Sequence, residues 1–157
     1  MAYRKDQHQA NTILLGSILK RLRQKRHMTE TDVATSLTIS LSTYSGWERG
    51  RCRPAFEDVM RFAVATDTDG IAIMCALFMH EPDFATRCAD NMFATKVLAG
   101  LDSINTRLAD VVSQMDGKAI ELSIENICNS VVAFKSHQQK TATEWFSDIR
   151  FGRRDVS

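Results

Sequence analysis

The sequence lacks the long apolar runs that mark a membrane protein or a secreted one. No apolar run among its 157 residues approaches the ~20 residues that a membrane-spanning helix needs. Residues 1–10 are polar and contain no apolar core of a signal peptide. We therefore expect a cytoplasmic protein with no membrane partner, built as one domain or as one domain with an appendage.

The sequence also lacks the residue patterns that carry catalysis or hold metals. Its four cysteines, Cys52, Cys75, Cys88 and Cys128, show no paired spacing and no neighbouring histidine cluster, which argues against a disulfide framework and against a metal site. We expect buried or inert thiols, with redox sensing by Cys52 as the alternative. The sequence has no Gly-rich phosphate loop and no nucleophile paired with a base. We therefore expect neither an enzyme nor a bound cofactor.

The net charge of +1 hides an asymmetry between the two parts of the chain. Residues 1–66 hold eleven Lys and Arg against six acidic residues, whereas residues 67–157 hold nine against thirteen. A basic part followed by an acidic part is typical of a nucleic-acid-binding module joined to a region that stays off the phosphates.

The most informative stretch runs from Met28 to Pro54 and has the pattern of a helix-turn-helix. Its apolar residues are spaced to bury one face of each of two short helices; they are Val33, Leu37, Ile39, Tyr44 and Trp47. Thr29, with Asp32 three residues later, is a capping pair for the first helix, and Ser40 is the cap of the second. A capped helix start presents backbone N–H groups, which suit a phosphate oxygen.

Together with Leu19–Arg23 and Phe56–Val59, this stretch resembles the DNA-binding domain of the Cro and lambda-repressor-like (XRE) family. The resemblance covers roughly residues 10–66 and is carried by Met28–Glu30, Val33–Ala34, Leu37, Ile39–Ser40, Tyr44, Trp47–Gly50 and Pro54. It implies that the second motif helix, Leu41–Glu48, enters the major groove of double-stranded DNA, and that two copies read two half-sites. It also implies that Arg23 turns inward and pairs with Glu48.

The resemblance assigns the base-facing positions to Leu41, Ser42, Ser45 and Gly46. These are weak readers, because Ser offers one contact, Leu only a thymine methyl contact and Gly no side chain. The side chains that we expect on phosphates are Thr29, Ser40, Thr43, Arg49, Arg51 and Arg53. Two interpretations stay open: specificity rests on DNA shape and phosphates, or the domain has drifted toward a different partner.

Two positions depart from the family pattern. Glu30 stands where the family often has a Gln that faces a phosphate, and a carboxylate there would repel it. Thr38 stands in the turn where Gly is usual. Because a β-branched residue tolerates a positive φ badly, the turn is either strained or differently shaped.

Further helices are expected on both sides of the motif. A spacing of i, i+3, i+4 and i+7 predicts an amphipathic helix through Leu15, Ile18, Leu19 and Leu22. Its other face carries basic residues that either attract phosphates or are simply solvated, namely Lys20, Arg21, Lys25 and Arg26. Helices are also predicted over 55–65 and 71–79. We divide the chain into a flexible arm (1–10), the helix-turn-helix domain (11–80) and a C-terminal region (83–157).

Two apolar stripes in the C-terminal region have the average period of 3.5 residues that belongs to helices packed lengthwise. The first stripe is Val97, Leu101, Ile104, Leu108, Val111 and Met115, and the second is Ile120, Ile124, Ile127, Val131 and Phe134. With a turn at Asp116–Gly117 they predict a hairpin of two helices, the second over about 118–140, followed by a tail. A hairpin alone buries little apolar surface, so we expect a second copy to complete a four-helix bundle; the alternative is packing only within the chain.

The expected fold class is all-α: a five-helix lambda-repressor-like DNA-binding domain followed by a long C-terminal helical hairpin. The expected function is a sequence-specific transcription regulator that binds an operator-like site as a homodimer or a higher even oligomer. The alternative is an antitoxin-like or assembly protein whose hairpin binds another protein, with DNA binding secondary. Whether a small-molecule effector takes part stays open.

Overall fold

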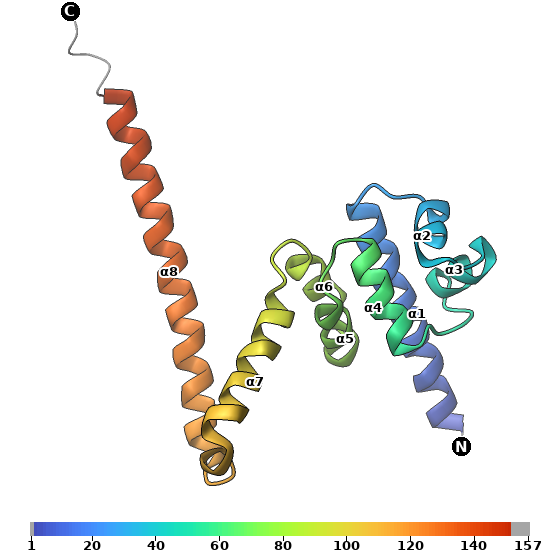
Figure 1. Ribbon diagram of the computed structural model, residues 1–157, viewed down its shortest axis with the longest axis horizontal. Coiled ribbons are helices and arrows are strands. Elements are labelled where there is room, and N and C mark those ends of the chain that lie inside the picture. Colours follow the sequence, from blue (N-terminus) through green and yellow to red (C-terminus); the bar gives the residue numbers. More distant parts are fainter. Residues whose placement is uncertain (1, 152–157) are drawn as a thin grey trace, which may run out of the picture. The chain divides into compact units, whose positions relative to one another are not determined.

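The computed structural model describes the backbone of residues 2–151 and the side chains of residues 6–108, 110–111 and 113–137. The described residues form eight helices and no strand, so the all-α class is confirmed. The helices, which Figure 1 labels, are α1 (Ala2–Lys25), α2 (Glu30–Leu37), α3 (Leu41–Glu48), α4 (Phe56–Ala65), α5 (Gly70–Met79), α6 (Pro82–Cys88), α7 (Phe93–Val112) and α8 (Gly117–Phe151).

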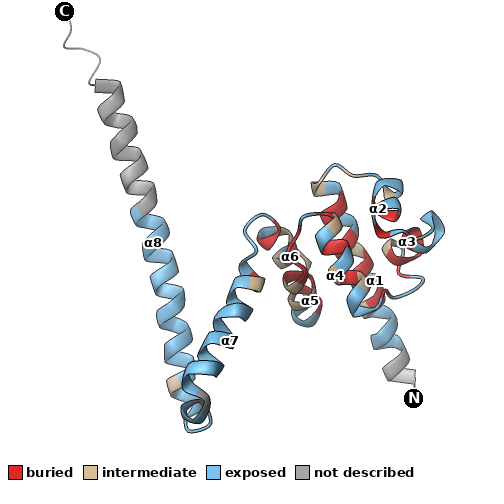
Figure 2. Cartoon of the chain, in the orientation of Figure 1, coloured by how far each residue is buried: buried red, intermediate tan, exposed pale blue. Residues whose placement is uncertain are grey.

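The chain divides into two compact units, Met1–Thr106 and Arg107–Ser157. The core of the first unit is built on the apolar face of α1, where the spacing of i, i+3, i+4 and i+7 puts four side chains on one side. All four are buried, and they are Leu15, Ile18, Leu19 and Leu22. The buried faces of α2, α3, α4 and α5 complete this core (Figure 2). Tyr44 of α3 joins them, because its ring stacks on Phe62 of α4 at a centroid distance of 6.3 Å.

Residues 2–10, where a flexible arm is expected from the sequence, are helical in the structure, since α1 begins at Ala2. This segment holds neither Gly nor Pro, and its Arg, Lys and Gln residues are good helix formers. Side chains of this segment contact residues outside α1: the Gln9 side-chain amide donates to the Gly50 carbonyl at 3.0 Å, and the Gln7 amide nitrogen lies 3.5 Å from Nε2 of His80. The first unit therefore starts with a continuous 24-residue helix.

The first compact unit extends past residue 80, where the sequence predicts the end of the helix-turn-helix domain, and it includes α6 and the start of α7. Helix α6 buries the small residues Ala85 and Cys88, and Ala89 is buried just after it. The adjacent acidic residues pair with the basic face of α1; the pairs are Arg21–Asp83 at 2.5 Å, Lys25–Asp90 at 2.6 Å and Arg26–Asp90 at 2.8 Å. From the sequence, the four basic residues on this face of α1 could either attract phosphates or simply be solvated. In the structure, three of them form ion pairs with acidic residues in or next to α6.

The second unit contains the end of α7 and all of α8. Leu108 has non-helical dihedrals (φ −123°, ψ 20°), so α7 is kinked close to the boundary between the units. Helix α8 runs for 35 residues to Phe151, beyond the end near residue 140 that sequence predicts, and it includes most of the expected tail. No helix in the described part of the chain is both long enough and apolar enough for a membrane span.

Asp69 connects three parts of the first unit. Its Oδ1 accepts hydrogen bonds from the Ile71 and Ala72 N–H groups at the start of α5, both at 3.1 Å, and from the Thr95 hydroxyl of α7 at 2.7 Å. Its Oδ2 accepts from the Thr95 N–H at 3.1 Å. Burial opposes ionisation of this carboxyl, but the hydrogen bonds from Thr95 and the backbone outweigh it and hold its pKa below the ordinary value.

Asp69→Asn should lower the free energy of unfolding at pH 7 by about 2 kcal/mol, because an amide cannot accept all the hydrogen bonds that reach this buried carboxylate. Because the pKa of Asp69 is lower in the folded state, the stabilisation by its carboxylate is complete at a pH above the unfolded-state pKa of about 3.9. This stabilisation is lost as the pH falls through the folded-state pKa. In urea unfolding, the free energy of unfolding should therefore fall less between pH 7 and pH 3 for the variant than for the wild type. An equal decline would contradict this role, and Asp102→Asn, at an exposed position of α7, is the control.

Candidate nucleic-acid interface

The first motif helix, α2, starts at the capping pair expected from sequence. The Asp32 N–H donates to the Thr29 hydroxyl at 3.1 Å, and the Thr29 N–H donates to the Asp32 carboxylate at 2.7 Å. The backbone hydrogen bond from Thr29 to the carboxylate also lowers the pKa of Asp32. Asp32 therefore replaces the more usual Glu or Gln of a capping box, and the start of α2 is fixed by its own residues.

The turn between the motif helices keeps a left-handed residue although that residue is β-branched. Thr38 has φ 59° and ψ 41°, and the Ile39 N–H donates to the Ala34 carbonyl at 3.0 Å to close the end of α2. Of the two possibilities left by the sequence, the structure has the strained turn. Ser40 then caps α3, because its hydroxyl accepts from the Thr43 N–H at 3.0 Å.

The direction of α3 is fixed by a buried ion pair, which is the pair that the resemblance implies. The Arg23 guanidinium of α1 donates to both carboxylate oxygens of Glu48, from Nε at 2.6 Å and from a terminal nitrogen at 2.9 Å. The Tyr44 hydroxyl donates to the same carboxylate at 2.7 Å, and Arg23 also donates to the Met28 carbonyl at 2.8 Å. Burial, followed by the hydrogen bond to Glu48, raises the pKa of Tyr44, so the phenol stays protonated as a donor.

A contact that sequence reasoning missed lets α3 approach α1 closely. A Cβ at Gly16 would lie 2.3 Å from the Trp47 carbonyl oxygen and 2.8 Å from that of Glu48. Only a residue without a side chain fits at position 16. Gly50, which has φ 65°, then turns the chain close to α1, so a Cβ at position 50 would lie 2.7 Å from Cγ1 of Ile13. The one signal in the sequence was a glycine in the middle of an otherwise amphipathic helix.

The outer surface of α3 is open at its start and closed in its middle. Leu41 is 49% exposed, and Ser42 and Thr43 are exposed beside it. Ser45, however, is only 6% exposed, and Gly46 is buried. The expectation that all four base-facing candidates face outward is therefore wrong for Ser45 and Gly46 in the free chain.

Residues that follow α3 cover these two positions. Arg49 folds back so that its guanidinium donates to the Ser45 hydroxyl. The Cys52 thiol occupies the space beside Gly46, where a Cβ would lie 2.9 Å from its Sγ. Cys52 itself is exposed, as is Cys128, whereas Cys75 is half-buried and Cys88 is buried.

The six side chains expected on phosphates are all exposed; they are Thr29, Ser40, Thr43, Arg49, Arg51 and Arg53. The Thr29 hydroxyl accepts its capping bond, so its own proton is available to an acceptor. Ser40 and Thr43 share one hydrogen bond at 2.8 Å, which leaves one hydroxyl proton between them. Glu30 is also at this surface, where its Oε1 lies 4.0 Å from the Arg49 guanidinium.

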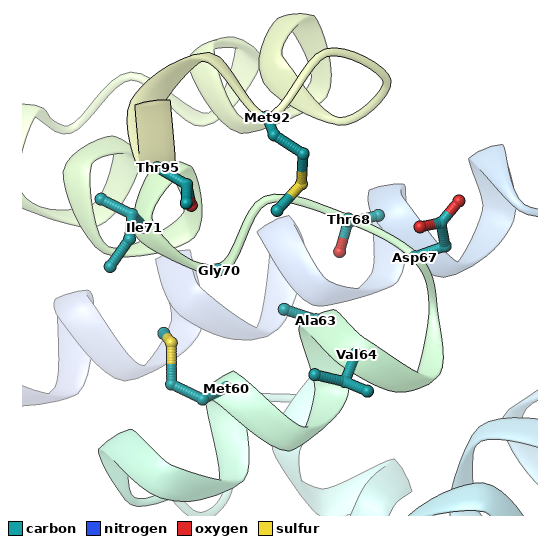
Figure 3. Close-up of a pocket in the computed structure, with 9 residues that line it drawn as sticks. All are labelled: Met60, Ala63, Val64, Asp67, Thr68, Gly70, Ile71, Met92 and Thr95. Atoms are coloured by element: carbon teal, nitrogen blue, oxygen red, sulfur yellow. The ribbon is translucent and has the colours of Figure 1, made fainter. Parts of the chain in front are cut away.

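A hollow of about 380 Å³ lies away from these residues, between α4, α5 and the start of α7 (Figure 3). Its walls are mostly apolar, with Met60, Val64 and Met92 among them. The hydroxyls of Thr68 and Thr95 on its wall are already bonded, to Thr66 and Asp69. In the described part of the chain, no buried side-chain N or O atom is without a hydrogen-bond partner, and no cluster of His, Cys, Asp and Glu could hold a metal ion.

A family model described as a helix-turn-helix domain matches residues 14–72, from within α1 to the first residues of α5. No curated protein and no solved structure matches the chain. The chain therefore carries a helix-turn-helix domain, with α2 and α3 as its motif, and this class of domain binds double-stranded DNA.

Thr38→Gly should raise the free energy of unfolding by about 1 kcal/mol, because Gly takes up the left-handed conformation without the penalty that a β-branched residue carries. Chemical denaturation of the full chain measures the change. Thr35→Gly, at an exposed position inside α2, is the matched control and should instead lower stability by about 0.5 kcal/mol. If Thr38→Gly were also destabilising, the turn would not be strained.

Proposed function

We propose that the chain is a sequence-specific transcription regulator of the lambda-repressor-like (XRE) type, which binds an operator-like site as a homodimer and acts by binding alone. The observation that carries the proposal is the exposed start of α3, held at a fixed angle by the Arg23–Glu48 pair. A second motif helix of this kind docks in the major groove with its N-terminal residues toward the base edges.

The side chains around α3 support DNA as the ligand. Leu41 can contact a thymine methyl group, and Ser42 can make one hydrogen bond to a base edge. Arg51 and Arg53 are exposed in the loop after α3, where they can neutralise phosphates. The N–H groups of the first turn of α3 suit a phosphate oxygen as well. The groups that can contact phosphates therefore outnumber those that can contact base edges, which favours sequence recognition largely through DNA shape.

The homodimer is supported by the two apolar stripes. The described side chains of the first stripe in α7 are 39–55% exposed, from Val97 to Val111, and those of the second stripe in α8 are 42–64% exposed. Figure 2 shows both helices as exposed over most of their described length. A helix with an apolar stripe, such as the 35-residue α8, draws most of its stability from packing that stripe against a partner. A second copy covers such stripes in matching register and supplies the two-fold symmetry that a pair of half-sites requires.

Ile127→Asp should convert a dimer into a monomer and abolish protection of a paired site, because a charge cannot be buried in the bundle core. Ile127 is 60% exposed within one chain, so the change should leave the fold of the first unit intact. The measurements are mass in solution by sedimentation and footprinting on genomic fragments. Leu122→Asp is the matched control, since Leu122 is an exposed apolar residue of α8 outside the stripe.

For the wild type, log affinity should fall steeply and linearly with log salt concentration at a discrete site. A wild-type protein that is monomeric and binds all DNA sequences with equal affinity and a shallow salt dependence would contradict the proposal. It would favour instead an antitoxin-like or assembly protein whose exposed stripes bind a different chain.

A further inference from the structure

The middle of the outer surface of α3 is formed by a side chain that comes from beyond the helix. Positions 41, 45 and 49 follow one another at intervals of four, so they share one side of α3. Ser45 is nevertheless buried, because the Arg49 guanidinium lies on it and donates to its hydroxyl. Gly46 contributes no side chain. The group that any ligand meets at the centre of this surface is therefore the guanidinium of Arg49, whose side chain is 53% exposed.

A carboxylate stands beside this guanidinium. Glu30 is the first residue of α2, and its Oε1 lies 4.0 Å from a terminal nitrogen of Arg49. The guanidinium is thus held between the start of α2 and the middle of α3. A negative charge at this distance repels the full charge of a phosphate more strongly than it repels the uncharged acceptor atoms of a base edge. Glu30 therefore makes Arg49 a poor phosphate ligand without removing its remaining N–H donors.

We propose that Arg49 reads a guanine edge in the major groove and that Glu30 is its positioning residue. This inference rests on the proposed DNA-binding function and replaces the expectation that Arg49 contacts a phosphate. Guanine presents two acceptors, N7 and O6, to which the parallel N–H groups of a guanidinium donate together. Ser45 and Gly46 fit this role, because neither projects between the guanidinium and the floor of the groove.

The test is selection of binding sites from a random double-stranded DNA library by the full chain. The wild type should select a site with one G·C pair at a fixed position in each half. Arg49→Ala should select the same site with that position relaxed, and its preference for guanine should fall by about 5- to 150-fold. Arg49→Lys should keep a weaker preference for guanine, since an ammonium can still donate to the two acceptors but lacks the paired planar donors of the guanidinium.

Arg51→Ala is the matched control for a phosphate contact. It should keep the selected guanine, weaken all sequences alike and reduce the salt slope by about 0.9. If Arg49→Ala behaves in this way, Arg49 is a phosphate ligand and the inference is overturned while DNA binding stands. If the wild type itself selects no site, the proposed function fails, and the inference fails with it.

Glu30→Gln tests the positioning role by a readout that a purely structural residue would not move. Loss of the negative charge should tighten binding to all DNA, while the freed guanidinium should lose part of its preference for guanine over the other bases. Tighter binding with an undiminished guanine preference would overturn the role of Glu30. Melting temperatures of all variants establish that the compared proteins are folded.

Discussion

The Glu48 carboxylate is the point at which the first unit fixes the direction of its second motif helix. It receives hydrogen bonds from the Arg23 guanidinium of α1 and from the Tyr44 hydroxyl of its own helix, and its side chain is only 3% exposed. A buried charge with good partners is tolerated, but the same charge left alone is costly, so other angles of α3 that separate these groups are disfavoured. The surface offered by Leu41, Ser42 and Arg49 depends on that angle.

Helix α1 carries this constraint to the rest of the unit. Gly16 lets the end of α3 lie directly on the α1 backbone, and the far end of α1 holds α6 through Arg21, Lys25 and Arg26. Asp69 then joins the start of α5 to the start of α7. The helix-turn-helix motif and the first turns of α7 are therefore parts of one packed unit. Such packing is required if α7 is to set the spacing between two copies of the motif in the proposed dimer.

Local rules predicted the parts of this body that depend on neighbouring residues. The stripe of α1, the Thr29–Asp32 and Ser40 caps and the all-α class follow from spacing and capping alone, and Arg23–Glu48 followed from family resemblance. The rest depends on residues distant in the sequence. Ser45 is covered by a side chain returning from beyond its helix, and Gly16 faces carbonyls about thirty residues away.

The Arg23–Glu48 pair holds α3 in the position on which the proposed DNA binding depends. This dependence can be measured by a double-mutant cycle with Arg23→Met, Glu48→Met and both together, in which urea unfolding and DNA affinity are determined for each protein. Each single change should lower the free energy of unfolding by about 3–5 kcal/mol, the double change should cost less than their sum, and DNA affinity should be low in all three variants. Single variants with wild-type unfolding curves and wild-type DNA affinity would show that the Arg23–Glu48 pair does not have this role.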